Sequence, residues 1–262
     1  MWSQCPHRWK TSYVDGIREY SDSIHTMFGT SMHEVIQTFL TVMYNDTAKL
    51  AEQLPLEDML RTRMKRNFEQ IVKANGGEMF CTERDMVEFY TQGIEILKFI
   101  RKKRGQYFSK KGYELIGIEV PLNYDLPSGI KFVGFIDIVI RDTVRDVIKI
   151  YDIKTSTMGW NKYMKADKNK TDQLLLYKQF YSKQFNHPID KIEVEYFIVK
   201  RKLYENVDFP QKRVQKFVPA NGKPSINKVV SRLDVFLKEC FTSDGEYNVE
   251  HIYRKEASKK NC

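Results

Sequence analysis

The sequence has no long apolar segment. No run of apolar residues approaches the roughly 18 that a membrane-spanning helix requires, so an integral membrane protein is not expected. The opening residues, MWSQCPHRWK, also lack the apolar centre of a secretory signal. We therefore expect a protein of the cytoplasm with no membrane partner.

Cysteines are few and scattered. No two of the four stand at close metal-ligand spacing, and a disulfide framework is not expected in a chain without a secretory signal. The sequence therefore predicts ordinary reduced thiols at Cys5, Cys81, Cys240 and Cys262.

The chain also lacks repeats and low-complexity linkers. Its 262 residues are 42% hydrophobic and 29% charged, which is typical of a soluble globular protein with a sizeable core. Acidic side chains are in the minority, because 43 Lys and Arg face 34 Asp and Glu for a formal net charge of +9. This excess points towards a polyanionic partner.

The first hundred or so residues have helical patterns. Ser31 and Glu34 have the spacing of a capping box, which predicts a helix that begins there and carries His33 in its first turn. Apolar periodicity predicts two further helices, over residues 56–74 and 82–104.

From Tyr113 the pattern becomes that of an α/β fold. The predicted strands are 113–122, 131–141, 147–155 and 192–200, and the predicted helices are 172–184, capped by Thr171, and 225–240. We expect a mixed central sheet with an N-terminal helical annex. The chain would be a single domain, with the annex over 1–110, the α/β core over 111–200, and a C-terminal strand, helix and basic tail over 201–262.

Two adjacent strand-like segments carry acidic residues. Asp137 lies in the first, and the second ends in Asp152-Ile153-Lys154, where Asp152 and Lys154 share a face. A turn centred near residues 144 and 145 would place Asp137 opposite Asp152, where two carboxylates repel unless a cation lies between them or one is protonated. Oxygen ligands at this spacing suit Mg²⁺ or Mn²⁺. The alternative is a pair of strand-end acids neutralised by lysines.

Four further residues accompany these acids, namely His33, Glu119, Gln173 and Tyr177. Taken alone, each has an ordinary explanation as a helix-edge histidine, a solvent-facing strand acid, or an i,i+4 surface pair. In this order and at these separations, with Cys5-Pro6-His7-Arg8-Trp9 at the start, the set resembles the RecB-like branch of the PD-(D/E)XK nuclease superfamily. The resemblance covers roughly residues 3–200 and is nearest to phage-encoded exonucleases.

The resemblance implies a restriction-endonuclease-like core and a role for each matched residue. His33, Asp137, Asp152 and the backbone carbonyl of Ile153 would be metal ligands, and Lys154 would orient or activate the attacking water and stabilise charge at the phosphate. Gln173 and Tyr177 would support the site or contact DNA, and Glu119 would be an accessory residue. The implied activity is Mg²⁺- or Mn²⁺-dependent DNA hydrolysis with one or two ions. It would be that of an exonuclease in phage or bacterial DNA replication, recombination or repair, in the bacterial cytoplasm.

Four lysines lie between the expected strand and helix of the site, at Lys162, Lys165, Lys168 and Lys170. We expect this loop to contact phosphates, with a solvated charged face as the alternative. A helicase or recombinase partner fits such a protein. A structure-specific endonuclease or resolvase, or a non-catalytic nucleic-acid-binding subunit, are the alternative functions.

The resemblance also raises the question of an iron–sulfur cluster. Some RecB-like nucleases bind such a cluster through one cysteine before the nuclease motifs and three grouped after them. Cys5 stands at the first position, but Cys262 has no neighbouring cysteines, and such a cluster normally takes four thiolates. We expect a colourless protein without iron, which absorbance and iron analysis would check.

Overall fold

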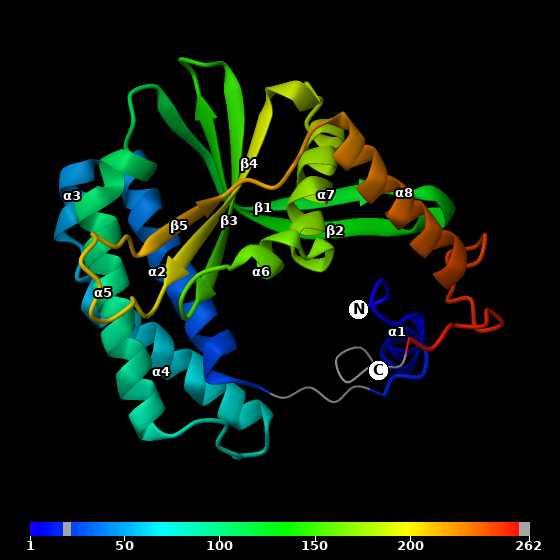
Figure 1. The fold of residues 1–262 in the computed structure, drawn as a ribbon, viewed down its shortest axis with the longest axis horizontal. Coiled ribbons are helices and arrows are strands. Elements are labelled where there is room, and N and C mark those ends of the chain that lie inside the picture. Colours follow the sequence, from blue (N-terminus) through cyan, green and yellow to red (C-terminus); the bar gives the residue numbers. More distant parts are fainter. Residues whose placement is uncertain (18–21, 257–262) are drawn as a thin grey trace.

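Five strands form one mixed sheet at the centre of the molecule, with helices on both of its faces (Figure 1). The computed structural model describes residues 1–17 and 22–256. The strand order β1-β2-β3-β4-β5 is antiparallel except between β3 and β4, which are parallel. The strands are β1 (Tyr113–Asp125), β2 (Lys131–Asp142), β3 (Val147–Ser156), β4 (Ile192–Lys200) and β5 (Val214–Phe217). The predicted α/β fold with a mixed sheet is confirmed.

One face of the sheet is covered by the N-terminal helices (Figure 1). These are α2 (Ile24–Asn45), α3 (Ala48–Gln53), α4 (Leu56–Ala74) and α5 (Glu83–Tyr107). Phe28, Met32 and Ile36 of α2 share a buried cluster with Tyr151 and Ile153 of β3. The helical annex is therefore built into the core of the sheet, which fixes α2 relative to β3.

The N-cap of helix α2 lies eight residues before the predicted one. Ser23 is its N-cap and accepts from the Thr26 amide, so the prediction of a cap at Ser31 is wrong. Ser31 is fully buried inside the helix, where its hydroxyl donates to the Met27 carbonyl at 3.0 Å. His33 consequently lies near the middle of a 22-residue helix, where its rotation is set by packing on both sides.

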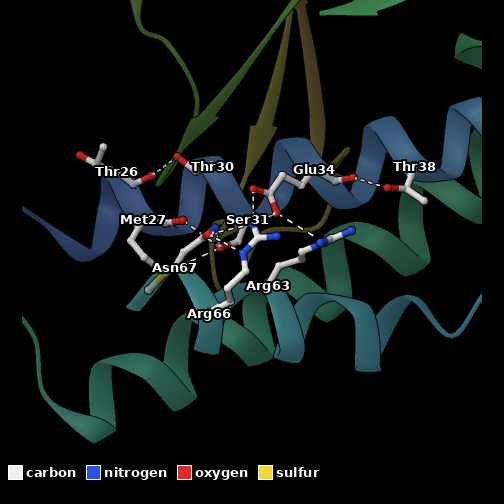
Figure 2. A network of polar contacts seen from close by, with 9 residues as sticks. All are labelled: Thr26, Met27, Thr30, Ser31, Glu34, Thr38, Arg63, Arg66 and Asn67. Carbon is white, nitrogen blue, oxygen red and sulfur yellow. Dashed lines mark hydrogen bonds and ion pairs between the residues drawn. The ribbon is translucent and has the colours of Figure 1, made fainter. Parts of the chain in front are cut away.

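A polar network on α2 and α4 fixes this rotation (Figure 2). Asn67 of α4 donates to the Ser31 hydroxyl at 3.0 Å, and both side chains are buried. Arg66 donates to both carboxylate oxygens of Glu34, at 2.5 and 2.6 Å, and Arg63 lies 3.4 Å from the same carboxylate. Because removal of one partner would leave a buried polar group unsatisfied, the network opposes rotation of α2.

The other face of the sheet carries α6 (Lys162–Ala166), α7 (Lys168–Gln184) and α8 (Lys223–Cys240). Helix α7 has Asp167 as its N-cap, so the predicted cap at Thr171 is wrong, and Thr171 is a buried helical residue. The segment predicted as a lysine-rich loop instead forms α6 and the first turn of α7. The crossover through these helices makes β4 parallel to β3, as expected for such a connection.

The short helix α1 (Pro6–Tyr13) packs away from the sheet, against the end of α8 and residues near the C-terminus (Figure 1). Trp9 lies in a buried cluster with Cys240 and Tyr253, and burial raises the pKa of the Cys240 thiol to about 12. Cys81 and Cys240 are free thiols, as predicted, whereas Cys5 is disulfide-bonded, so the prediction of a reduced thiol there is wrong. Cys262 lies outside the described residues.

Among the described residues, no helix has both the length and the apolar composition that crossing a membrane requires.

Candidate active site

The register of β2 and β3 brings the two predicted aspartates together. Ile138 pairs with Tyr151 and Val139 with Ile150, which is the register of a turn centred between residues 144 and 145. The ladder ends one residue short of Asp137, whose Oδ2 instead accepts a hydrogen bond from the Ile153 amide at 2.6 Å. The expected β2–β3 register is confirmed, and Asp137, expected opposite Asp152, contacts the next residue of β3 through its side chain.

Asp152 and Lys154 form a close ion pair on the face of β3 that α7 covers. The Lys154 Nζ lies 2.8 Å from Asp152 Oδ2, and only 2% of the Asp152 side chain is exposed. That Oδ2 atom is buried and has no hydrogen bond of good geometry. Lys154 also donates to Gln173 Oε1 at 3.1 Å, so its ammonium is held between the Asp152 carboxylate of β3 and the Gln173 amide of α7.

Helix α7 continues this polar chain to Tyr177. Gln173 Nε2 donates to the Tyr177 hydroxyl at 3.0 Å, as the i,i+4 spacing allows. Tyr177 packs so closely on β2 that a Cβ at Gly134 would lie 2.9 Å from its ring. Burial raises the pKa of Tyr177, which keeps its hydroxyl protonated. Gln173 and Tyr177 therefore support Lys154 from the helix side.

Helix α2 brings His33 to the same place. His33 Nδ1 lies 3.7 Å from Asp137 Oδ2, and ligand atoms of His33, Glu119 and Asp137 all lie within 4.8 Å of one another. The close approach of α2 depends on Gly29, because a Cβ there would lie 3.3 Å from the Thr155 hydroxyl at the end of β3. The predicted residues from α2, β1, β2, β3 and α7 thus converge on one site.

Glu119 is held in an uncommon backbone conformation. Its φ of 49° is left-handed, which costs a residue other than glycine about 1 kcal/mol or more. The ladder pairs Ile118 with Ile138 and Val120 with Ile136, so Glu119 occupies the unpaired position across from Asp137. Gln37 of α2 donates to its Oε1 at 2.5 Å. Strain of this kind accumulates at functional sites, where neighbouring contacts maintain it.

Burial changes the acid–base properties of the cluster. Desolvation raises the pKa of Asp137 and of Asp152, with the Lys154 ammonium opposing this shift at both carboxyls. Desolvation also lowers the pKa of His33, although the Asp152 carboxylate and the Ile153 carbonyl favour its protonated form. The imidazole therefore favours its neutral form, and burial disfavours the ionised form of the two carboxyls. A bound cation would stabilise the carboxylates and could accept the neutral ring nitrogen as a ligand.

The donor set fits a divalent metal ion. Mg²⁺ and Mn²⁺ prefer carboxylate oxygens, and Mn²⁺ also accepts imidazole. Asp137 and Glu119 supply carboxylates and His33 supplies a ring nitrogen, while the buried Asp152 carboxylate lies beside them with Lys154 as its partner. Carboxylate oxygens beside a neutral ring nitrogen are donors that a divalent cation can bind.

The four predicted lysines lie on α6 and the start of α7. Lys162 and Lys168 are exposed, whereas Lys165 lies over the Phe217 ring and Lys170 over the Trp160 ring, each at 5.7 Å. These contacts anchor part of the basic segment beside the helix that carries Gln173. Their contact with phosphate remains a prediction.

Two residues that the sequence analysis did not single out shape this site. Gln37 lies one helical turn after His33, so both side chains leave the same face of α2 and each approaches one acid of the cluster. Gly29 precedes His33 by one turn and sets how near that face comes to β3. The sequence signal for both residues was their spacing, because positions four residues before and after His33 lie on the same face of a helix.

The chain belongs to the PD-(D/E)XK nuclease superfamily, whose family model matches residues 2–247. Fourteen chains of solved structures are also similar to it. One is a protein from Eubacterium rectale named "Putative exonuclease", with a TM-score of 0.47 and 14% sequence identity over 89% of this chain and 73% of that one. No curated protein sequence has a significant similarity to the chain. The predicted superfamily is confirmed, whereas the RecB-like branch and the phage relationship stay predictions.

Proposed function

We propose that the protein is a Mg²⁺- or Mn²⁺-dependent deoxyribonuclease that acts as an exonuclease in DNA replication, recombination or repair. The observation that carries this proposal is the placement of Lys154. Its ammonium lies beside buried Asp152 and is supported by Gln173, next to the cluster of His33, Glu119 and Asp137. This is the charge arrangement that phosphodiester hydrolysis requires.

Each residue has a chemical task in this proposal. His33, Asp137, Asp152, the Ile153 carbonyl and Glu119 hold one or two divalent ions. A bound ion would act as a Lewis acid on the phosphate and favour deprotonation of the attacking water. The low exposure of His33, Asp137 and Asp152 limits competition from solvent and strengthens electrostatic effects on the substrate.

Lys154 has a separate task beside Asp152. Its ammonium has three donors, of which contacts to Asp152 and Gln173 occupy two directions. The remaining donor is free to orient the attacking water or to bind a non-bridging phosphate oxygen as negative charge develops there. Gln173, fixed by Tyr177, keeps the ammonium in this position when substrate enters.

A cleavage assay with two DNA forms tests the proposal. End-labelled linear DNA and covalently closed circular DNA are incubated with Mg²⁺, Mn²⁺ or EDTA. We expect metal-dependent degradation of linear DNA alone, since an exonuclease needs an end. Cleavage of the circle would instead support an endonuclease or resolvase. DNA binding without cleavage in any metal would support a non-catalytic subunit, and cleavage only with an added helicase or recombinase would indicate an obligate partner.

The basic segment on α6 and α7 supplies a second test. If about five phosphates are neutralised, the log of DNA affinity should fall with the log of salt concentration at a slope near −4. Replacement of the four lysines by glutamine should make that slope about 3 to 4 units shallower. The lysines are Lys162, Lys165, Lys168 and Lys170. An unchanged slope would mean that the segment is only a solvated face.

A further inference from the structure

We infer that Gln37 is a positioning residue that holds Glu119 in the conformation required for metal binding. The inference rests on the proposed metal-dependent function and assigns a task to a residue outside the predicted site. Gln37 is 8% exposed and donates from Nε2 to Glu119 Oε1 at 2.5 Å. It therefore contacts one carboxylate of the cluster from α2.

Glu119 needs such a partner more than the other acids do. Asp137 accepts from the Ile153 amide and Asp152 contacts Lys154, so both are fixed by the central strands. Glu119 is exposed, its side chain is longer than that of an aspartate, and its backbone has a φ of 49°. Several rotamers would be open to an exposed glutamate, and a single contact that selects one of them lowers the entropy lost when a ligand binds.

The geometry allows the contact and the ligand role together. A carboxylate has two oxygens, each with acceptor capacity to spare, so Oε1 can accept from Gln37 while an oxygen faces His33 and Asp137. A neutral amide donor suits this task, because a cationic donor would compete with the metal for the carboxylate. Polar partners that orient metal ligands typically change metal affinity by 10- to 100-fold when they are lost.

Helix α2 couples the two halves of this arrangement. His33 and Gln37 are four residues apart on one face, and the same helix is held by the Ser31–Asn67 contact on its other side. The helix therefore delivers one ligand directly and positions a second one through Gln37. The distance between His33 and Glu119 is set by helix geometry as well as by the sheet.

The test is calorimetric titration of Mn²⁺ into the full metal-free chain, with no DNA present. Gln37→Met removes the donor while preserving length and helix propensity, and we expect it to weaken Mn²⁺ binding by about tenfold, the same loss as is expected when the Glu119 carboxylate itself is removed. Tyr44→Phe is the matched control, because it removes one hydrogen bond of α2, to the Phe108 carbonyl, away from the cluster. The control variant should bind Mn²⁺ as the unchanged chain does.

A double-mutant cycle separates positioning from a general structural effect. Once Glu119→Gln has removed the carboxylate, adding Gln37→Met should weaken Mn²⁺ binding by less than twofold further, because Gln37 acts through Glu119. Equal Mn²⁺ affinity of Gln37→Met and the unchanged chain, or independent effects of the two substitutions, would overturn the inference. Absence of Mn²⁺ binding by the unchanged chain would instead overturn the proposed function.

Discussion

The two strand pairs that carry the acids are built differently. Between β2 and β3 the ladder is regular up to Ile138 and Tyr151, and Asp152 at its end is 2% exposed. Between β1 and β2 the register shifts near Gly117 and the backbone is left-handed at Glu119, which stays exposed. One side of the cluster is therefore fixed by backbone pairing, and the other by a side-chain contact from a helix.

This difference indicates where the site can adjust. Asp137 and Asp152 can move only if β2 and β3 move, since one accepts from the β3 backbone and the other is buried. Glu119 can change rotamer without disturbing the sheet. The regular pair would set the position of a metal ion, and the irregular pair would adapt to its coordination and to substrate.

The largest effect is expected at the regular pair. Asp152→Asn keeps the shape of the side chain but removes a buried charge, so we expect at least about a 10³-fold loss of cleavage and much weaker Mn²⁺ binding. Asp142→Asn is the matched control, because Asp142 is likewise a buried aspartate. It lies at the end of β2 away from the cluster, where it accepts a hydrogen bond from the Arg145 amide. Cleavage rates and calorimetry check both variants, and an active Asp152→Asn protein would contradict the assignment.

Lys154 should separate catalysis from metal binding. Lys154→Met removes the ammonium that contacts Asp152 and Gln173, and we expect cleavage to fall about 10²- to 10³-fold while Mn²⁺ still binds. Lys149→Met is the control on the same strand, where the ammonium pairs with Glu193. Rates under saturating DNA and Mn²⁺ titrations measure the two effects. Loss of Mn²⁺ binding in Lys154→Met would show that the residue only organises Asp152.

A smaller effect is expected at the irregular pair. Glu119→Gln should weaken Mn²⁺ binding about tenfold and lower cleavage mainly at limiting metal, because His33, Asp137 and Asp152 remain. Glu114→Gln, on the same strand and exposed, should change neither quantity. Cleavage measured across a range of Mn²⁺ concentrations tests this. A loss as large as that of Asp152→Asn at saturating Mn²⁺ would abolish the distinction between the two strand pairs.

The smallest effect is a pH-dependent change in thermal stability. Burial raises the pKa of Asp137 and Asp152 to about 6, against about 4 in an unfolded chain. Between these values the two carboxyls bind more protons in the folded chain than in the unfolded one, so their contribution to the stability of the metal-free protein should fall as pH rises from about 4 to 6. Metal ligands bind deprotonated, so Mn²⁺ should raise the melting temperature by a few degrees more at pH 8 than at pH 5. Equal melting-temperature shifts on addition of Mn²⁺ at pH 5 and at pH 8, measured by circular dichroism, would contradict the raised pKa values of the two buried carboxyls.

Much of the regular pair could be predicted from the sequence. The polar turn between residues 141 and 147 fixes the β2–β3 register, and strand alternation then places Asp152 and Lys154 on one face. The helix predicted over 56–74 is observed over the same residues, and its Leu56, Leu60 and Met64 are buried. Local patterns sufficed here because the contacts that decide these elements are local.

The helix starts were less predictable. Ser31-x-x-Glu34 matches a capping box, but a buried serine can also donate back to its own helix, as Ser31 does to Met27. The apolar residues Ile24, Met27 and Phe28 continue the same stripe and were the signal for an earlier start. At α7, both Asp167 and Thr171 are plausible caps, and the lysine-rich sequence between them offers no apolar period to decide.

The support of Glu119 depends on tertiary packing and could not be predicted. Its contact with Gln37 joins residues 82 positions apart, and its positive φ follows from the irregular β1–β2 ladder. Sequence periodicity assigns faces only where alternation is regular. At Glu119 the alternation fails, and this is where the site takes its accessory acid.

The two close-packed glycines have a consequence for how activity could be lost. Gly29 lets α2 approach Thr155, and Gly134 lets Tyr177 rest on β2, each at a distance that a methyl group would enlarge. An alanine at either position would leave every acid, the lysine and the histidine in the sequence. A relative with such a change would retain all the residues by which a nuclease is recognised, yet α2 or Tyr177 would have to shift to relieve the close contact. The spacing between the helices and the sheet can therefore change in a relative without any change in the acids, the lysine or the histidine.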